Sequence, residues 1–150
     1  NVASMLANRG YFYTPHIIKE IEGRPGHKKN IITKRDSGID SVHFPLVINA
    51  MEEALHGTAW RAIIPGIAIC GKTGTVENSH GEDQSVFMAF APKDDPKIAI
   101  SVYIENSGWG GRAAASTASL VIEKYLKGEI SKKWLEEYVL DGDFLDAKER

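Results

Sequence analysis

The chemistry of this sequence is concentrated in ten residues, Gly66 to Thr75, which read Gly-Ile-Ala-Ile-Cys-Gly-Lys-Thr-Gly-Thr. One interpretation is a phosphate loop, because Gly, four residues and Gly-Lys-Thr is the spacing whose backbone N–H groups hold phosphates at the start of a helix. The other interpretation is an extended strand that carries Lys-Thr-Gly-Thr. The two require different backbones and exclude each other.

The strand interpretation is the better supported, because Ile67 to Cys70 are apolar and favour an extended, buried backbone. The residues that follow Lys72 include glycine and β-branched side chains, which start a helix poorly. In a strand, Thr73 and Thr75 point to the same side with their hydroxyls about 7 Å apart. Gly74 lets a ligand or a facing helix approach the backbone. Such a strand suits a ligand carboxylate laid along it, or an extended peptide paired to its edge.

Two alternatives to this carboxylate site stay open from the residues alone. Lys72 could be a surface lysine beside two strand-forming threonines, with no ligand at all. The phosphate-loop spacing leaves a nucleotide-binding module as the other alternative.

Composition places the chain among ordinary globular domains. It has 150 residues, of which 43% are hydrophobic and 25% charged, and its formal net charge is −2. This balance gives no electrostatic footprint for nucleic acid, and no apolar run reaches the roughly 18 residues of a membrane span. Cys70 is the single cysteine and follows an apolar run, so we expect it to be buried, with no internal disulfide and no cysteine-rich metal site. No cofactor and no metal are predicted.

Apolar periodicity and turn residues predict the elements that position this strand. Helices are expected at 2–9 with Gly10 as the C-terminal cap, at 44–56, at 112–127, and from an N-cap at Ser131 to Leu140. Extended segments are expected at 11–21, 30–34, 70–76, 85–91 and 97–105. The predicted fold class is therefore α+β, a mainly antiparallel sheet flanked by helices.

The same periodicity predicts which faces are buried. Both alternating faces of strand 97–105 can be buried, which favours a sheet covered by helices on both sides. Helix 112–127 begins with alanines, which let a helix lie close to a sheet. Two further apolar faces are predicted, on helix 44–56 (Leu46, Val47, Ala50, Met51, Ala54 and Leu55) and on the last helix (Trp134, Leu135, Tyr138 and Val139).

Residues near the strand carry weaker predictions. Trp109 lies between glycines and could line a groove or cap the core, and we favour the core. Arg112 is expected to cap its helix or to pair with a nearby acid. Glu77, Asn78 and His80 leave the strand in a loop that could rim the site.

These segments together resemble the C-terminal part of the transpeptidase domain of class B penicillin-binding proteins, and the elongation-type penicillin-binding protein 2 in particular. The resemblance is carried by Lys72-Thr73-Gly74-Thr75, by Ser85 to Pro92 with its Phe-Ala-Pro end, and by the opening Ala3 to Gly10 followed by Tyr13 to Ile18. It covers residues 1 to about 127. It implies a partial β-lactamase/transpeptidase-like fold over residues 1–128, followed by a C-terminal helix and polar tail at 129–150.

The resemblance also implies a function, the cross-linking of peptidoglycan by serine acyl transfer. Lys72, Thr73, Gly74 and Thr75 would bind the carboxylate of a stem peptide ending in D-Ala-D-Ala, or of a β-lactam antibiotic that mimics it. The backbone N–H of Thr75 would form part of the oxyanion hole. The other implied partner is the upstream half of the same domain. The implied location is the extracytoplasmic, periplasmic side of the bacterial membrane, with an anchor in an N-terminal segment outside this chain.

Two of the three motifs that this chemistry needs are missing. Neither Ser-x-x-Lys nor Ser-x-Asn occurs anywhere in the 150 residues. The chain is therefore expected to contain no catalytic side chain and to be inactive alone, as a fragment of a complete enzyme or as a pseudoenzyme. A non-catalytic interaction domain stays open as an alternative function.

Overall fold

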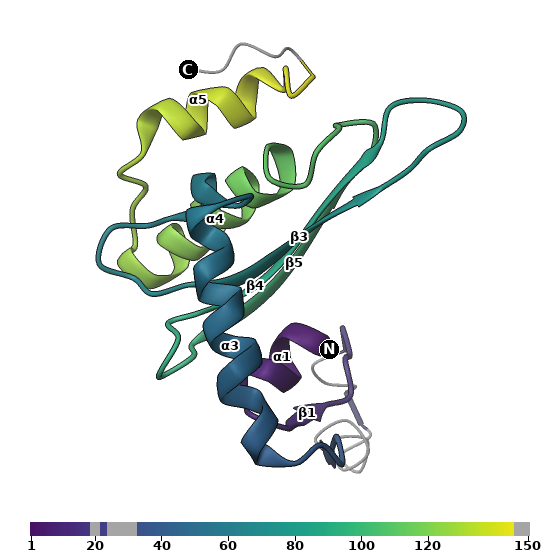
Figure 1. The fold of residues 1–150 in the computed structure, drawn as a ribbon, viewed down its shortest axis with the longest axis vertical. Helices are drawn as coiled ribbons and strands as arrows, with labels where there is room; N and C mark the ends of the chain where they lie inside the picture. The colour runs from purple at the N-terminus through teal and green to yellow at the C-terminus, as the bar shows by residue number, and fades with distance from the viewer. Residues whose placement is uncertain (19–21, 24–32, 146–150) are drawn as a thin grey trace.

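The computed structural model describes residues 1–18, 22–23 and 33–145, and Figure 1 shows how their elements are arranged. The strands form two antiparallel sheets: β1 (Tyr11–Tyr13) pairs with β2 (Lys34–Asp36), and β3 (Cys70–Val76), β4 (Gln84–Ala91) and β5 (Ile98–Ile104) follow one another in space as in sequence. The α-helices are α1 (Val2–Ala7), α3 (Phe44–Glu53), α4 (Ala113–Lys127) and α5 (Lys133–Asp141). Short 3₁₀ turns lie at Ser41–His43, Ala54–His56 and Trp60–Ala62. The predicted α+β class with an antiparallel sheet is confirmed.

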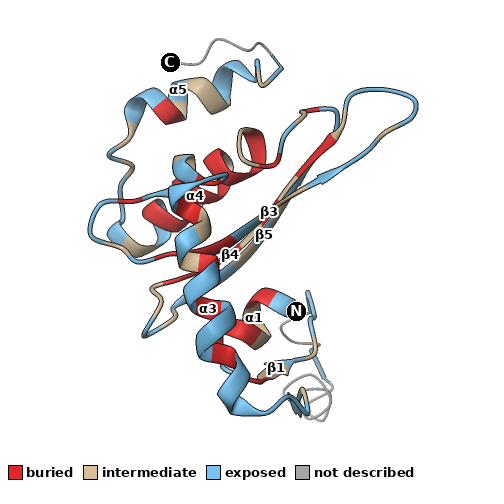
Figure 2. Ribbon diagram, viewed as in Figure 1, coloured by how far each residue is buried: buried red, intermediate tan, exposed pale blue. Residues whose placement is uncertain are grey.

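Helix α4 covers one face of the three-stranded sheet. Its alanines Ala114, Ala115 and Ala118 are fully buried and pack in one cluster with Phe87 and Ala89 of β4. Because these side chains are small, the helix approaches the sheet closely, as the sequence predicted. Figure 2 shows the buried residues concentrated on α4 and along the sheet beside it.

Helices α1 and α3 cover the opposite face. Leu6 of α1 and Ile48 of α3 are buried in a second cluster with Cys70 of β3 and Phe90 of β4. Cys70 is fully buried, as expected, and burial raises the pKa of its thiol to about 11. Because the sheet has a cluster on each face, alternate residues of β4 belong to different clusters.

Burial on both faces does not extend to β5, so the sequence prediction is wrong there. Ile98, Ile100 and Val102 pack against the α4 cluster, whereas Ala99, Ser101 and Tyr103 are exposed. Within the described residues β5 is an edge strand, and the α1–α3 layer buries β3 and β4 instead.

The predicted apolar face of the helix at 44–56 is right for Met51 and Leu55 and wrong for Leu46, Val47 and Ala50. The residues that α3 and the turn after it bury are Phe44, Ile48, Met51 and Leu55, at spacings of four, three and four. Leu46 and Val47 are exposed, and so is Ala50. The segment is apolar around most of its circumference, so periodicity alone did not decide which face meets the sheet.

The N-terminal segments are shorter than predicted. Helix α1 ends at Ala7, and Arg9 and Gly10 then take positive φ angles, so Gly10 lies beyond the cap. Only Tyr11–Tyr13 of the expected extended stretch is a strand. The second strand lies at Lys34–Asp36, and most of the predicted 30–34 segment, like residues 19–21, falls outside the described residues.

The C-terminal helix α5 forms where predicted, but Ser131 does not cap it. The backbone N–H and hydroxyl of Ser131 both donate to the carboxylate of Glu123, at 3.1 and 2.5 Å, and the helix begins at Lys133. Leu135 is the buried residue of its predicted apolar face. Among the described residues, no helix is long and apolar enough to cross a bilayer.

Candidate functional site

A pocket with a volume of about 590 Å³ lies at the β3 end of the sheet. Three segments meet there: the turn after α3 (Gly57, Thr58, Trp60 and Arg61), strand β3 (Thr73 and Thr75), and the loop before α4 (Trp109, Gly110, Gly111 and Arg112). A volume of this size is in the range of small-molecule sites.

Strand β3 runs over Cys70–Val76, as the sequence predicted, so no helix follows Lys72 and the backbone of a phosphate loop is not present. Its pairing with β4 sets Thr73 opposite Phe87 and Thr75 opposite Ser85. Phe87 belongs to the cluster under α4, so both threonines lie on the α4 face of the sheet. The predicted pair of hydroxyls on one side of the strand therefore lines the pocket.

Both hydroxyls already have polar neighbours. The Oγ1 atoms of Thr58 and Thr73 are 3.2 Å apart, within hydrogen-bond distance. The Oγ1 of Thr75 accepts a long hydrogen bond of 3.4 Å from the backbone N–H of Gly110. Because Thr75 accepts at its oxygen, its hydroxyl hydrogen remains available to donate to a ligand oxygen.

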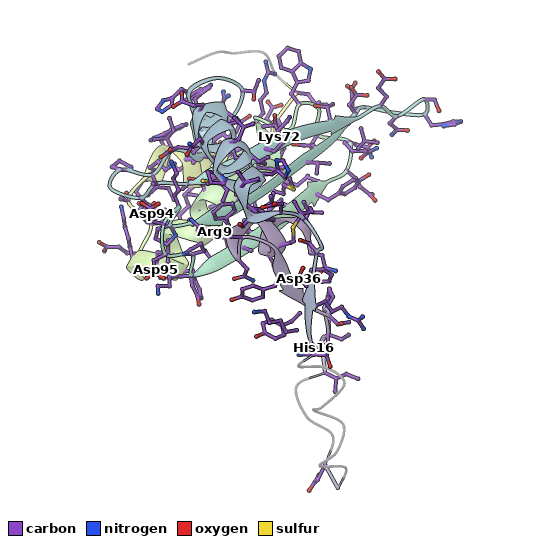
Figure 3. All side chains as sticks on the ribbon, turned by 60° about the horizontal axis from the view of Figure 1, so that its bottom comes forward. Arg9, His16, Asp36, Lys72, Asp94 and Asp95 are labelled. Atoms are coloured by element: carbon purple, nitrogen blue, oxygen red, sulfur yellow. The ribbon has the colours of Figure 1, made fainter. Side chains whose placement is uncertain are left out.

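Lys72 and Gly74 alternate with the threonines and lie on the other face of β3, the face shared with Cys70. Lys72 is exposed, and its Nζ donates to the backbone oxygen of Thr73 at 2.6 Å. Figure 3 shows Lys72 apart from Arg9, Asp94 and Asp95. A Cβ at Gly74 would meet only the Val86 side chain at 3.5 Å, so the space beside this glycine is open. The structure therefore separates the four predicted site residues into two pairs.

The loop before α4 is held against the sheet by backbone contacts. A Cβ at Gly110 would overlap the carbonyl oxygens of Gly74 and Val86, and a Cβ at Gly111 would overlap the carbonyl oxygen of Thr58. Only glycine permits so close an approach. These contacts fix the loop relative to the two threonines.

The buried Ser85 strengthens this attachment. Its Oγ donates to the backbone oxygen of Trp109 at 3.1 Å and accepts from the backbone N–H of Ala114 at 2.9 Å. It thereby joins β4 to both sides of the loop. The sequence placed Ser85 at the start of a strand and in the segment that resembles the family, whereas its positioning role follows from the register that sets it opposite Thr75.

Trp109 is 68% exposed and lines the pocket, so the prediction that it caps the core is wrong. The glycines around it turn the loop so that its backbone, and not its indole, meets the sheet. Arg112 occupies the N-cap position of α4 without a side-chain capping bond, and its guanidinium lies 5.3 Å from the Trp109 ring centroid. No described acid pairs with it.

Sequence reasoning missed Thr58, Trp60 and Arg61. They lie in the turn between α3 and β3, where no periodicity marks a function. The signal that could have found them is the succession of a hydroxyl, an aromatic ring and a guanidinium within four residues, 58–61. The pocket brings this group within reach of Thr73 and Thr75.

The loop between β3 and β4 makes its contacts away from the pocket. The backbone N–H of Asn78 donates to Asp83, and its side-chain amide donates to Asn106 at 3.1 Å. Glu77, Asn78 and His80 do not line the pocket, so their predicted position at its rim is not supported. Among the described residues no three acidic, histidine or cysteine side chains gather as metal ligands.

Comparison with known proteins gives a consistent result. The family model for the penicillin binding protein transpeptidase domain matches residues 1–123. The peptidoglycan D,D-transpeptidase PbpA of Mycobacterium tuberculosis is 31% identical over 141 residues, which cover 85% of this chain and 28% of that protein.

Two solved structures share the fold. Penicillin-binding protein 2 of Pseudomonas aeruginosa, in complex with WCK 5153, superposes with a TM-score of 0.69 at 28% identity, covering 88% of this chain and 30% of that one. The imipenem acyl-enzyme complex of penicillin-binding protein A from M. tuberculosis gives a TM-score of 0.59 at 22% identity, covering 94% and 28%. The chain thus spans between a quarter and a third of the length of these relatives.

Proposed function

Because the chain belongs to the penicillin-binding protein transpeptidase domain family, we propose that it supplies the carboxylate-binding wall of a peptidoglycan D,D-transpeptidase. The observation that carries the proposal is the pair of hydroxyls, Thr73 and Thr75, on one face of an edge strand and inside a pocket of about 590 Å³. An edge strand can also pair with the backbone of an extended peptide.

In the proposed reaction, the hydroxyls of Thr73 and Thr75 donate to the terminal carboxylate of a stem peptide ending in D-Ala-D-Ala. A serine then attacks the carbonyl of the penultimate D-alanine, the terminal D-alanine leaves, and an amine of a second peptide takes the acyl group. The backbone N–H of Thr75 stabilises the oxyanion. A β-lactam would occupy the same position, with its carboxylate on the two hydroxyls.

Lys72 and Gly74 serve the other side of the strand. Lys72 would direct its positive charge toward the serine motifs, which this chain lacks. The open space beside Gly74 would admit the substrate backbone or the facing helix. In this proposal the nucleophile comes from the serine motifs of the upstream half of the domain.

The missing motifs make the upstream half of the domain the main partner of this chain. The exposed apolar residues Leu46 and Val47 of α3 and Tyr103 of β5 are available to contact it. In this proposal, residues 1–128 complete the transpeptidase domain, residues 129–150 extend it, and the assembled enzyme acts on the extracytoplasmic, periplasmic side of the membrane through an N-terminal anchor.

The test of the carboxylate site uses the chain itself and N-acetyl-D-Ala-D-Ala. All three tryptophans lie in or beside the pocket, since Trp60 and Trp109 line it and Trp134 stacks on Trp60. Their indole N–H signals in an NMR titration should therefore move. Thr75→Val should weaken binding by about 1–3 kcal/mol, because it removes one hydrogen bond to a charged group. Thr14→Val, which changes a threonine outside the pocket, is the matched control.

Equal affinity of Thr75→Val and the unchanged chain would remove this hydroxyl from the site. With a fluorescent penicillin, the chain alone should form no adduct that survives denaturation, because it has no Ser-x-x-Lys. A labelled band at 16.5 kDa that unlabelled penicillin removes would reveal an unrecognised nucleophile. Micromolar ATP or GTP affinity that Lys72→Ala abolishes would favour the nucleotide-binding alternative instead.

A further inference from the structure

The pocket contains two guanidinium groups that the proposed function does not use. Arg61 enters from the turn after α3, and Arg112 enters from the start of α4. The pocket lining contains no aspartate or glutamate, and neither guanidinium forms an ion pair with any acid that the structure describes. Two positive charges thus share one pocket without an internal counter-ion.

Aromatic rings hold both guanidinium groups. The guanidinium carbon of Arg61 lies 4.3 Å from the Trp60 ring centroid and 5.6 Å from that of Tyr138. That of Arg112 lies 5.3 Å from the Trp109 ring centroid. A guanidinium that lies over a ring keeps its N–H groups free at the edge, where they can bind a carboxylate in a bidentate manner.

The backbone around Arg61 is also fixed. The Nζ of Lys132 donates to the backbone oxygens of Arg61 and Ile63 at 3.0 and 2.8 Å. Trp134 of α5 stacks on Trp60, with ring centroids 6.3 Å apart and an interplanar angle of 16°. The segment after α4 therefore holds the Arg61 side of the pocket in place, which is what a binding residue needs.

We propose that Arg61 and Arg112 form a second anion subsite, which binds a carboxylate that the peptide substrate carries before its D-Ala-D-Ala end. This inference rests on the proposed function. The threonine hydroxyls bind the terminal carboxylate, whose single negative charge balances only one of the two arginines. The pocket has two cations and extends from β3 to Trp60, so it suits a ligand with a second negative group. The substrate class is an acidic peptide, in preference to one with a neutral or basic side chain at that place.

The test compares ligands that differ in one charge. N-succinyl-, N-glutaryl- and N-adipoyl-D-Ala-D-Ala place a second carboxylate at three distances from the terminal one. The neutral control for each ligand is the same compound with the carboxylate of its acyl group replaced by a carboxamide. Each ligand is titrated into the 150-residue chain while the tryptophan indole signals are recorded by NMR. At least one acid should bind about tenfold more tightly than its amide, as expected for one charge-assisted bidentate contact.

Three variants locate the effect. Arg112→Gln and Arg61→Gln should each reduce the acid-to-amide ratio to below about threefold and leave N-acetyl-D-Ala-D-Ala affinity within about twofold. Arg35→Gln removes a guanidinium outside the pocket, one that donates to Thr14, and should change neither quantity. Circular dichroism checks that each variant is folded.

The outcomes separate the inference from the proposed function. If every acid binds within about twofold of its amide while Thr75→Val still weakens N-acetyl-D-Ala-D-Ala, the second subsite is overturned and the carboxylate site stands. If the arginine variants weaken N-acetyl-D-Ala-D-Ala as much as the acids, both cations act on the terminal carboxylate and the second subsite is again overturned. If no ligand moves the indole signals, both proposals are overturned.

Discussion

Two regions of the molecule use positive charge in opposite ways. Around Glu123, which is fully buried, Lys127 lies 3.5 Å from the carboxylate and Ser131 donates two hydrogen bonds to it. Nearby, the Nζ of Lys132 donates to two backbone oxygens and to Ser119. In the pocket, Arg61 and Arg112 contact aromatic rings and no described acid. We infer that the first group of charges holds the fold together and that the second is kept for a ligand.

The largest expected effect is at Glu123. Glu123→Gln removes a buried charge and weakens both bonds from Ser131, so the free energy of unfolding should fall by about 3 kcal/mol. Equilibrium urea unfolding measures it. Glu137→Gln, on the exposed side of α5, should change it by less than about 0.5 kcal/mol. Similar losses for the two variants would contradict the structural role of the Glu123 cluster.

The pocket should depend on its backbone contacts more than on its charges. Gly110→Ala forces a methyl group against the carbonyl oxygens of Gly74 and Val86. Unfolding free energy should fall by about 2 kcal/mol, the usual size of an overpacking loss. Gly74→Ala meets only Val86 at 3.5 Å and serves as the control. Equal stability of the two variants in urea would show that the loop before α4 moves freely.

The lowered pKa of Lys132 should make the free energy of unfolding depend on pH. Burial lowers the pKa of this amine from 10.5 to about 8, while the charge of Glu123 raises it and that of Lys127 lowers it further. Below pH 8 the lysine is charged in the folded and in the unfolded chain, so the full cost of burying its charge lowers the free energy of unfolding. Above pH 8 the unfolded chain holds a proton that the folded chain has released, so this residue makes unfolding free energy rise with pH.

The window for this measurement is pH 7.5 to 9. At higher pH the buried thiol of Cys70, whose pKa is raised to about 11, acts with the opposite sign, because the unfolded chain then loses a proton that the folded chain keeps. Urea unfolding at several pH values should show a rise in the unchanged chain relative to Lys132→Met. Parallel pH profiles would contradict the lowered pKa.

The smallest expected effect on stability is that of removing the two pocket arginines, in contrast to the loss expected at Glu123. The double variant Arg61→Gln, Arg112→Gln loses three cation–π contacts at half-buried positions and no ion pair with a described acid, so its unfolding free energy should change by less than about 2 kcal/mol. A thermal melt beside Glu123→Gln gives the comparison directly. A loss as large as that of Glu123→Gln would mean that the pocket arginines are structural.

The elements that the sequence predicted well are those in which local and tertiary preferences agree. Strand β3 was predicted residue for residue, because its β-branched and apolar side chains suit the strand and its glycines exclude a helix. Helix α4 and its closing Gly128, which has a φ of 80°, were predicted for the same reason.

The failures lie where partners distant in sequence decide. The buried face of α3 depends on which side meets the sheet, since Leu46 and Ile48 are both apolar. Ser131 has the composition of an N-cap, but Glu123, eight residues earlier, takes both of its donors. At the site, the sequence predicted the two hydroxyls of β3 but not Thr58, Trp60 and Arg61, because a turn has no periodicity that reveals what it faces.

The glycine pair before α4 has an evolutionary consequence. Gly110 and Gly111 meet the carbonyl oxygens of Gly74, Val86 and Thr58, so the closest contacts of the junction are made by main chain. The hydroxyls of Ser85 and Thr75 add hydrogen bonds to it. Mutations at the flanking Trp109 and Arg112 can then accumulate, or be selected, without shifting the hydroxyl pair. Two residues with no side chain thus fix the frame of the pocket, while the side chains beside them form a surface that substitutions can change separately.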